Sequence, residues 1–290
     1  MRKTSVRELH IRTSEFVREA EMGGVIVIER RGEPVAELRS ITAPSRMPAG
    51  SKARIFDAMQ DIWARMPQVG MAMADVLERL GYQLDFPEKQ TCCGQPAFNT
   101  GYRDEARAVA RHFLDTFEGS APIVVPSGSC ASMVAHHFAE LFAQEPETLA
   151  RVHALEKRVW EFSAFLTEVA RVEDVGARFE DIVTFHDGCH SLREMGIREG
   201  PRRLLARVQG LELRELEPAE ECCGFGGTFA VKFGELSGAM ARSKVDAILR
   251  TGARTVVSLD PSCLMQIRGA LSRQGSNIRT MHLAEVLASR

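Results

Sequence analysis

Cysteine is the residue type with the clearest capacity for chemistry in this sequence. Two pairs are adjacent and each pair precedes a glycine: Cys92 with Cys93, and Cys222 with Cys223. Three further cysteines stand alone, at positions 130, 189 and 263. Seven is an odd number, and we expect a cytoplasmic chain, in which disulfides are rare. The pattern therefore predicts metal binding or redox chemistry.

The cysteine pairs belong to two similar segments. The first, "CCGQPAFN" at 92–99, precedes a helical pattern, a strand pattern and "IVVPSGSC", which ends at Cys130. The second, "CCGFGGTF" at 222–229, precedes the same succession and "TVVSLDPSC", which ends at Cys263. The two pairs lie 130 positions apart and the two later cysteines 133. The sequence therefore predicts an internal duplication of roughly a hundred residues per copy.

Each copy alternates helical and strand patterns. Apolar residues between Ala106 and Phe117 recur at helical spacing, and Gly119 follows before the next strand pattern. Such alternation is typical of an α/β fold with mainly parallel sheets, which we predict for both halves.

The cysteines all follow predicted strands. Cys130, Cys189 and Cys263 come after short apolar runs, and the two pairs come after "YQLDF" at 82–86 and "LELREL" at 211–216. Open α/β sheets bind ligands beyond the carboxyl ends of their strands. We therefore expect two groups of thiols at two such edges.

The adjacent pairs bear on which metal the thiols would hold. Neighbouring residues in an extended segment point to opposite sides, which suits one zinc ion poorly because structural zinc sites use cysteines two to four residues apart. An iron–sulfur cluster is larger and takes thiolates as its normal ligands. The sequence favours a cluster, with zinc and buried structural thiols as alternatives.

The two halves differ in their cysteine count. The second half has four cysteines, and the first has three. The duplication places the missing cysteine at Met59 or Gln60, beside Asp57 and Asp61 as weaker oxygen donors. We predict that the first site is incomplete.

Polar residues surround Cys189 in "HDGCH". His186, Asp187 and His190 could tune a cluster or relay a proton. Hydrogen-bonding support of a metal ligand is the simpler interpretation.

From about residue 52 to the end, the chain resembles the cysteine-rich CCG family, in particular its lactate-utilisation members. The segments "DFPEKQTCCGQPAFNTGYRDEAR", "HDGCHSLREMGIREGPR" and "EECCGFGGTFAVKF" carry the resemblance. It implies an iron–sulfur protein with a four-iron cluster, acting with other subunits in the oxidation of L-lactate or a related 2-hydroxyacid. The family begins its first motif with a cysteine where this chain has "AMQDI", and one member has a further cysteine where this chain has Gln266.

The resemblance also implies the cluster ligands. The ligands of the second motif would be Cys189, Cys222, Cys223 and Cys263, and those of the first would be Cys92, Cys93 and Cys130.

Residues 1–46 resemble a different family, the prevent-host-death antitoxins. "VIVIE" and "PVAEL" flank "RRGE", a hairpin pattern, and Ser5 with Glu8 predicts a helix capping box. The resemblance implies a small α+β module that forms a homodimer and binds DNA. The segment has nine Lys and Arg against seven Asp and Glu, and a Pro- and Gly-containing linker follows it.

Together these patterns predict four segments. They are an antitoxin-like module at 1–46, a first half at 52–145, a helical connector at 146–180 that includes a helix over 156–169, and a second half at 181–290. The duplication predicts no counterpart for the connector.

The overall composition restricts the function classes. Hydrophobic residues make up 44% and charged residues 26%, as in ordinary globular proteins, and the net charge of −2 gives no general attraction to nucleic acid. We expect no membrane insertion, because no stretch of 18 apolar residues is present. Three hypotheses follow: an iron–sulfur electron-transfer subunit, a redox-responsive DNA-binding regulator with the cysteine-rich part as sensor, and a fusion whose front module only dimerises or is vestigial.

The duplication yields a direct test at position 60. A Gln60→Cys change should raise the iron bound per chain after anaerobic reconstitution, because thiolate is a stronger iron ligand than an amide. Met59→Cys should do less, since neighbouring strand residues point to opposite faces. No gain at either position would mean that the first half has no metal site.

Overall fold

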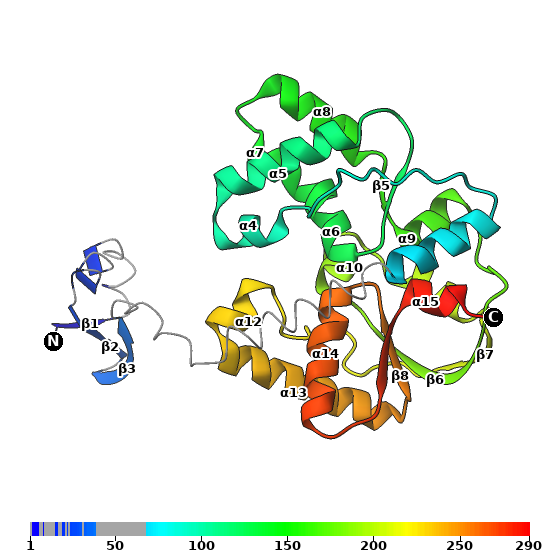
Figure 1. Ribbon diagram of the computed structural model, residues 1–290. Helices are drawn as coiled ribbons and strands as arrows, with labels where there is room; N and C mark the ends of the chain where they lie inside the picture. Colours follow the sequence, from blue (N-terminus) through cyan, green and yellow to red (C-terminus); the bar gives the residue numbers. More distant parts are fainter. Residues whose placement is uncertain are drawn as a thin grey trace. The chain divides into compact units, whose positions relative to one another are not determined.

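The computed structural model describes residues 2–5, 8, 15–16, 19–20, 22, 24–30, 32–38 and 68–290 (Figure 1). Its contacts divide the chain into two units, Met1–Ile55 and Phe56–Arg290. Met59, Gln60 and both nearby aspartates lie outside the described residues.

The first unit contains a small sheet. Strand β1 (Arg2–Ser5) runs parallel to β2 (Ile26–Arg30), and β2 pairs antiparallel with β3 (Glu33–Leu38). Gly32 lies between β2 and β3 with φ +87°, a conformation that glycine adopts without strain. The predicted hairpin is therefore confirmed, whereas the antitoxin-like character of the module stays a prediction.

The second unit is built on parallel strands. Its larger sheet has the order β7-β6-β8-β9, and β4 pairs in parallel with β5. The strands are β4 (Ile123–Val125), β5 (Val159–Glu161), β6 (Arg178–His186), β7 (Gln209–Leu213), β8 (Thr255–Ser258) and β9 (Arg279–His282). The predicted α/β class with parallel sheets is confirmed.

Helices connect these strands, beginning with a helix over residues 68–79. The others are α4 (Gln95–Thr100), α5 (Arg103–Thr116), α6 (Gly128–Ser132), the π-helix η1 (Met133–His137), α7 (Phe138–Leu141), α8 (Pro146–Glu156), α9 (Phe162–Ala164), the π-helix η2 (Phe165–Val169), α10 (Cys189–Arg193), α11 (Glu199–Leu205), α12 (Thr228–Lys232), α13 (Gly234–Thr251), α14 (Pro261–Arg273) and α15 (Leu283–Ala288).

The structure corrects the predicted helix over 156–169. Helix α8 ends at Glu156, and β5 then pairs with β4 before α9 begins. Buried Val159 and Glu161 alternate with half-buried Trp160, which is a strand pattern too short to be recognised in the sequence. Part of the predicted connector also has a counterpart in the second half, because the strand and helix β5–α9 are repeated there as β9–α15. Glu161 and His282 hold the same place, each capping the following helix by accepting backbone N–H hydrogen bonds.

The predicted strand at 82–86 is a second error. These residues form no strand, and Leu84 and Phe86 are exposed. A strand needs a partner for its backbone groups, and among the described strands β4 is bonded to β5 alone. The corresponding segment of the second half does form β7, because β6 lies beside it.

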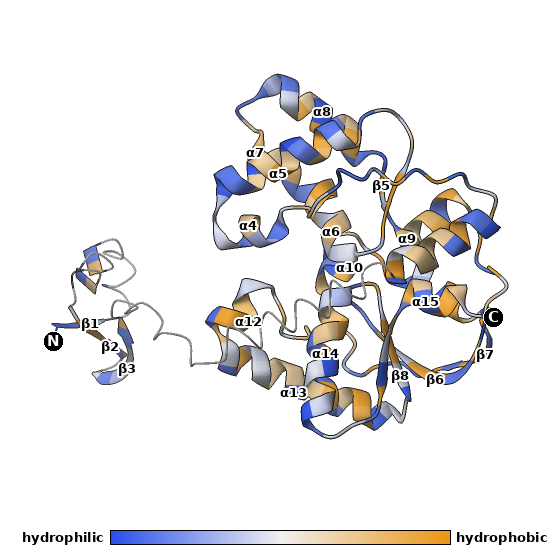
Figure 2. Cartoon of the chain, viewed as in Figure 1, coloured by the Kyte–Doolittle hydropathy of each residue, from blue (hydrophilic) through white to orange (hydrophobic). Residues whose placement is uncertain are grey.

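The largest hydrophobic core is shared by the two halves. It covers one face of the larger sheet and combines the helix at 68–79, from the first half, and η2, from the predicted connector, with β6, α11 and α15, from the second half. Separate clusters lie around α5, η1 and α8, and around α13 and α14. Figure 2 shows the apolar residues along β6 and on the helices around it. Neither half therefore completes its core alone.

A buried carboxyl group joins the halves at their centre. Ser127 Oγ and the Ser129 backbone N–H, at the start of α6, both donate to Asp260 Oδ1 at 2.9 Å. Ser191 Oγ, in α10, donates to Asp260 Oδ2 at 3.2 Å. Ser127 lies three residues before Cys130, and Asp260 lies three residues before Cys263. The hydrogen bond between Ser127 and Asp260 thus joins equivalent positions of the two repeats. The backbone approaches closely here, since a Cβ on Gly188 would lie 2.3 Å from Asp260 Oδ2.

Removing this carboxyl group should destabilise the fold. We expect Asp260→Ala to lower the free energy of unfolding by about 3 kcal/mol, because buried donors in α6 and α10 lose their acceptor. Urea denaturation of the metal-free protein measures this. Asp246→Ala, on the exposed face of α13, is the matched control and should change stability by less than about 0.5 kcal/mol. Equal effects of the two substitutions would contradict the account.

Candidate metal centre

The four cysteines of the second half come together at one edge of the sheet. Cys189 is the first residue of α10, directly after β6, and Cys263 lies in the first turn of α14, after β8. Cys222 and Cys223 lie in the loop between β7 and α12. The thiols are in hydrogen-bonding contact in the order Cys189, Cys222, Cys223 and Cys263. Thiols far apart in the sequence thus form one continuous group.

The paired cysteines depend on a glycine. Gly224 has φ +83°, and a Cβ there would lie 2.6 Å from the carbonyl oxygen of Ser237 in α13. The Gly224 N–H donates to Cys222 Sγ at 3.3 Å. Ser237 Oγ donates to the Gly224 carbonyl at 2.7 Å, and Gln266 Nε2 donates to Ser237 Oγ at 3.0 Å. Gln266 thus supports the loop that holds the pair.

His186 faces the thiols from the end of β6. It is fully buried, and a ring nitrogen and the sulfurs of Cys223 and Cys263 lie within 4.8 Å of one another. Within the described part of the chain, neither ring nitrogen has a hydrogen-bond partner. Burial, reinforced by the positive charge of Lys244, lowers the pKa of His186 to about 4. The imidazole is therefore neutral at physiological pH.

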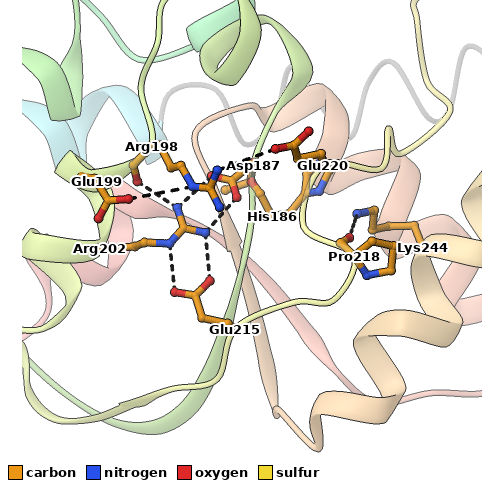
Figure 3. Close-up of polar contacts among 10 residues, drawn as sticks. His186, Asp187, Arg198, Glu199, Arg202, Glu215, Pro218, Glu220 and Lys244 are labelled. Atoms are coloured by element: carbon orange, nitrogen blue, oxygen red, sulfur yellow. Dashed lines mark hydrogen bonds and ion pairs between the residues drawn. The ribbon is translucent and has the colours of Figure 1, made fainter.

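Lys244 brings a buried positive charge to the same place. Its side chain, from α13, is fully buried and its Nζ donates to the Pro218 carbonyl at 3.5 Å (Figure 3). Burial lowers its pKa, while the charges of Glu221, Cys222 and Cys223 oppose that change. A buried ammonium group needs negative charge nearby, and the cysteines supply it when they ionise.

Sequence reasoning missed Lys244, although a signal was present. Ala241, Lys244, Val245 and Ile248 form one stripe at helical spacing, and a lysine on such a stripe is expected to be buried.

The first half has an apolar residue where the second has Lys244. The glycine after each cysteine pair packs against a helix: Gly94 lies against Val109 of α5, and Gly224 lies against Met240 of α13. Val109 and Met240 are therefore equivalent positions of the two repeats, 131 residues apart. Phe113 is then the counterpart of Lys244. The first half therefore lacks this buried cation.

Asp187 and Arg202 fix the end of β6. The Arg202 guanidinium donates to both carboxyl oxygens of Asp187, at 3.0 and 2.8 Å, and to both of Glu215, at 2.9 Å each (Figure 3). This network ties β6 to α11 and to the segment after β7. His190 instead faces Glu194, with 3.5 Å between His190 Nδ1 and Glu194 Oε1. Of the polar residues predicted around Cys189, Asp187 thus supports the strand end and His186 faces the thiols.

The three cysteines of the first half also meet. Cys92 and Cys93 precede α4, Cys130 lies in the first turn of α6, and the Cys93 thiol contacts both of the others. Cys93 is buried and Cys92 is exposed. Hydrogen bonding from Cys93 lowers the pKa of Cys92 to about 6.

Comparison with known proteins identifies the domain. The family model described as CCG, cysteine-rich domain, matches residues 57–135 and again residues 183–268. The chain belongs to the cysteine-rich CCG-domain family. The two matches confirm the predicted duplication, and they begin after the predicted antitoxin-like module.

Relatives include lactate utilization protein A of Bacillus cereus strain G9842, which is 44% identical over 222 residues, covering 77% of this chain and 92% of that protein. Lactate utilization protein A of Bacillus thuringiensis strain Al Hakam is 45% identical with the same coverage. Across the described residues of this CCG-domain chain, no helix has the length and apolar composition needed to cross a membrane.

The pKa of Cys92 can be tested by alkylation. In the metal-free protein, the rate of iodoacetamide modification at Cys92 should rise with pH through about 6, because the thiolate is the nucleophile and hydrogen bonding stabilises it. Peptide mass spectrometry across a pH series measures the rate at each cysteine. Buried Cys223, whose pKa is raised by its hydrogen bond to Cys222, should stay unmodified. A midpoint near the ordinary value of about 8.5 at Cys92 would contradict this.

Proposed function

We propose that this chain is the iron–sulfur electron-transfer subunit of a system that oxidises L-lactate or a related 2-hydroxyacid. The observation that carries the proposal is the gathering of Cys189, Cys222, Cys223 and Cys263 at one sheet edge. The names of the relatives supply the lactate-utilisation context.

The donor set fits an iron–sulfur cluster. Four thiols provide one ligand for each iron of a four-iron cluster, and thiolate is the usual ligand. A cluster with four thiolates carries net negative charge, which matches the buried ammonium of Lys244. When bound, such a cluster accepts and releases single electrons.

The protein's own residues would prepare this site. Cys263 lies in the first turn of the 13-residue helix α14, where the helix dipole favours a thiolate over a thiol. Asp187 and Arg202 hold the strand end that precedes Cys189. Cys222 and Cys189 are only half-buried, so electrons could reach this centre from a partner.

A candidate segment for such a partner follows the Cys222–Cys223 loop in the chain. Val231 and Phe233, at the end of α12, and Leu236, in the first turn of α13, are more than half exposed, at 52, 56 and 55%. They follow the Cys222–Cys223 loop directly in the chain. Exposed apolar residues in one segment are typical of protein interfaces.

The regulator hypothesis depends on residues 1–46 alone. The described residues there show a three-stranded sheet, and the family matches begin at residue 57. No observation on the described residues favours DNA binding or dimerisation, so we propose the electron-transfer function.

The cysteines allow a direct test of the proposal. Cys222→Ser should remove most of the iron and sulfide bound after anaerobic reconstitution, whereas Cys130→Ser should remove less, because its set lacks a fourth cysteine. Iron, sulfide and zinc analysis measures this. Equal losses would show that the two sites are equivalent, and zinc in place of iron and sulfide would refute the cluster.

The lactate link needs the assembled system. The chain is co-purified with its partner subunits, and L-lactate is added anaerobically. Reduction of the cluster by L-lactate, lost in Cys222→Ser, is the expected result. A loaded cluster that L-lactate never reduces in the complete complex would contradict the proposed substrate class.

A further inference from the structure

Three buried side chains of the described residues, Thr184, His186 and Thr280, make no hydrogen bond, and His186 is the one among them that faces the thiols. It is fully buried, and neither ring nitrogen finds a hydrogen-bond partner within the described residues. Buried polar groups are nearly always paired, and an unpaired one is a sign of a ligand or a functional role. His282, at the end of β9, shows the ordinary case: its Nε2 lies 3.0 Å from the Leu259 carbonyl and its Nδ1 accepts from the Ala284 N–H at 3.1 Å.

The position of His186 indicates what its partner is. A ring nitrogen lies within 4.8 Å of both Cys223 Sγ and Cys263 Sγ. The residue projects from the same strand end as Asp187, whose carboxyl group is engaged by Arg202 (Figure 3). The imidazole therefore borders the space in which the thiols of the second half meet.

We propose that His186 contacts the iron–sulfur centre of the second half directly, with its imidazole N–H donating a hydrogen bond to a sulfur atom of the centre. The inference rests on the proposed function. A hydrogen bond fits better than ligation, because four thiolates already supply one ligand for each iron of a four-iron cluster.

This contact would set the reduction potential of the centre. Reduction adds one electron, so negative charge on the sulfurs increases while no bond forms or breaks. An N–H donor stabilises the reduced state more than the oxidised state, and hydrogen bonds to sulfur are among the factors that tune cluster potentials. Loss of the donor should therefore lower the midpoint potential.

Two substitutions test the proposal. His186→Phe keeps a planar ring without the N–H, and His186→Gln keeps an N–H donor on a different side chain. His153→Phe, on the exposed side of α8, is the matched control. Each protein is reconstituted anaerobically with iron and sulfide, analysed for both elements and titrated for its midpoint potential. Pulsed electron paramagnetic resonance of the reduced protein, with and without ¹⁵N-histidine, detects histidine nitrogen near the cluster.

The proposal predicts a specific combination of results. Iron and sulfide per chain should stay unchanged in both His186 variants, and the potential should fall in His186→Phe and fall less in His186→Gln. The wild type should show a weak histidine nitrogen coupling that both variants lose and His153→Phe retains. If His186→Phe does not fold, the His186→Gln protein alone tests the contact, and the proposal predicts that it lacks the histidine nitrogen coupling.

Three results would overturn the proposal. A strong nitrogen coupling, with iron lost from the variants, would make His186 a ligand rather than a hydrogen-bond donor. No histidine coupling in a wild type that holds iron and sulfide would remove the contact while leaving the proposed function intact. A wild type that binds no iron and sulfide would refute the proposed function, and the contact with it.

Discussion

The buried carboxyl group of Asp260 is the contact on which the arrangement of the thiols depends. Its three hydrogen bonds come from Ser127 and Ser129 at the start of α6 and from Ser191 in α10, while Asp260 itself precedes α14. These three helices carry Cys130, Cys189 and Cys263 in their first turns. A buried carboxyl group is tolerated only when donors surround it, so the helix starts must stay together. One side chain thereby fixes the spacing between both cysteine sets.

The same duplication that creates this contact has allowed the halves to diverge. The shared core beneath the larger sheet requires both copies, and Glu161 and His282 still cap equivalent helices. Around the thiols, however, the copies differ. The second set has four cysteines and buried Lys244, and the first has three cysteines and Phe113. The full set of four thiols and the buried cation thus belong to one copy, whereas the scaffold is common to both.

Much of this arrangement could be predicted from the sequence. Short apolar runs that end before "SC" located β4 and β8, and the repeated "CCG" located both loops. The strand β5 was missed because only three residues carry its pattern, and the strand expected at 82–86 was wrong because a strand depends on a neighbour that local sequence does not reveal. Contacts such as Ser127 with Asp260, 133 positions apart, leave no local pattern at all. Lys244 was also missed, although its place on an apolar helical stripe was a local signal that its side chain is buried.

The central claim is that the second half alone completes a thiolate site for one iron–sulfur cluster. Native mass spectrometry of the anaerobically reconstituted Cys130→Ser protein tests this most directly, because it counts iron and sulfide on a folded chain whose first set is further depleted. The account predicts a chain that carries one four-iron, four-sulfide cluster. A chain that carries only zinc, or no metal, while the unsubstituted protein holds a cluster, would show that the cluster depends on the first set and would contradict the account.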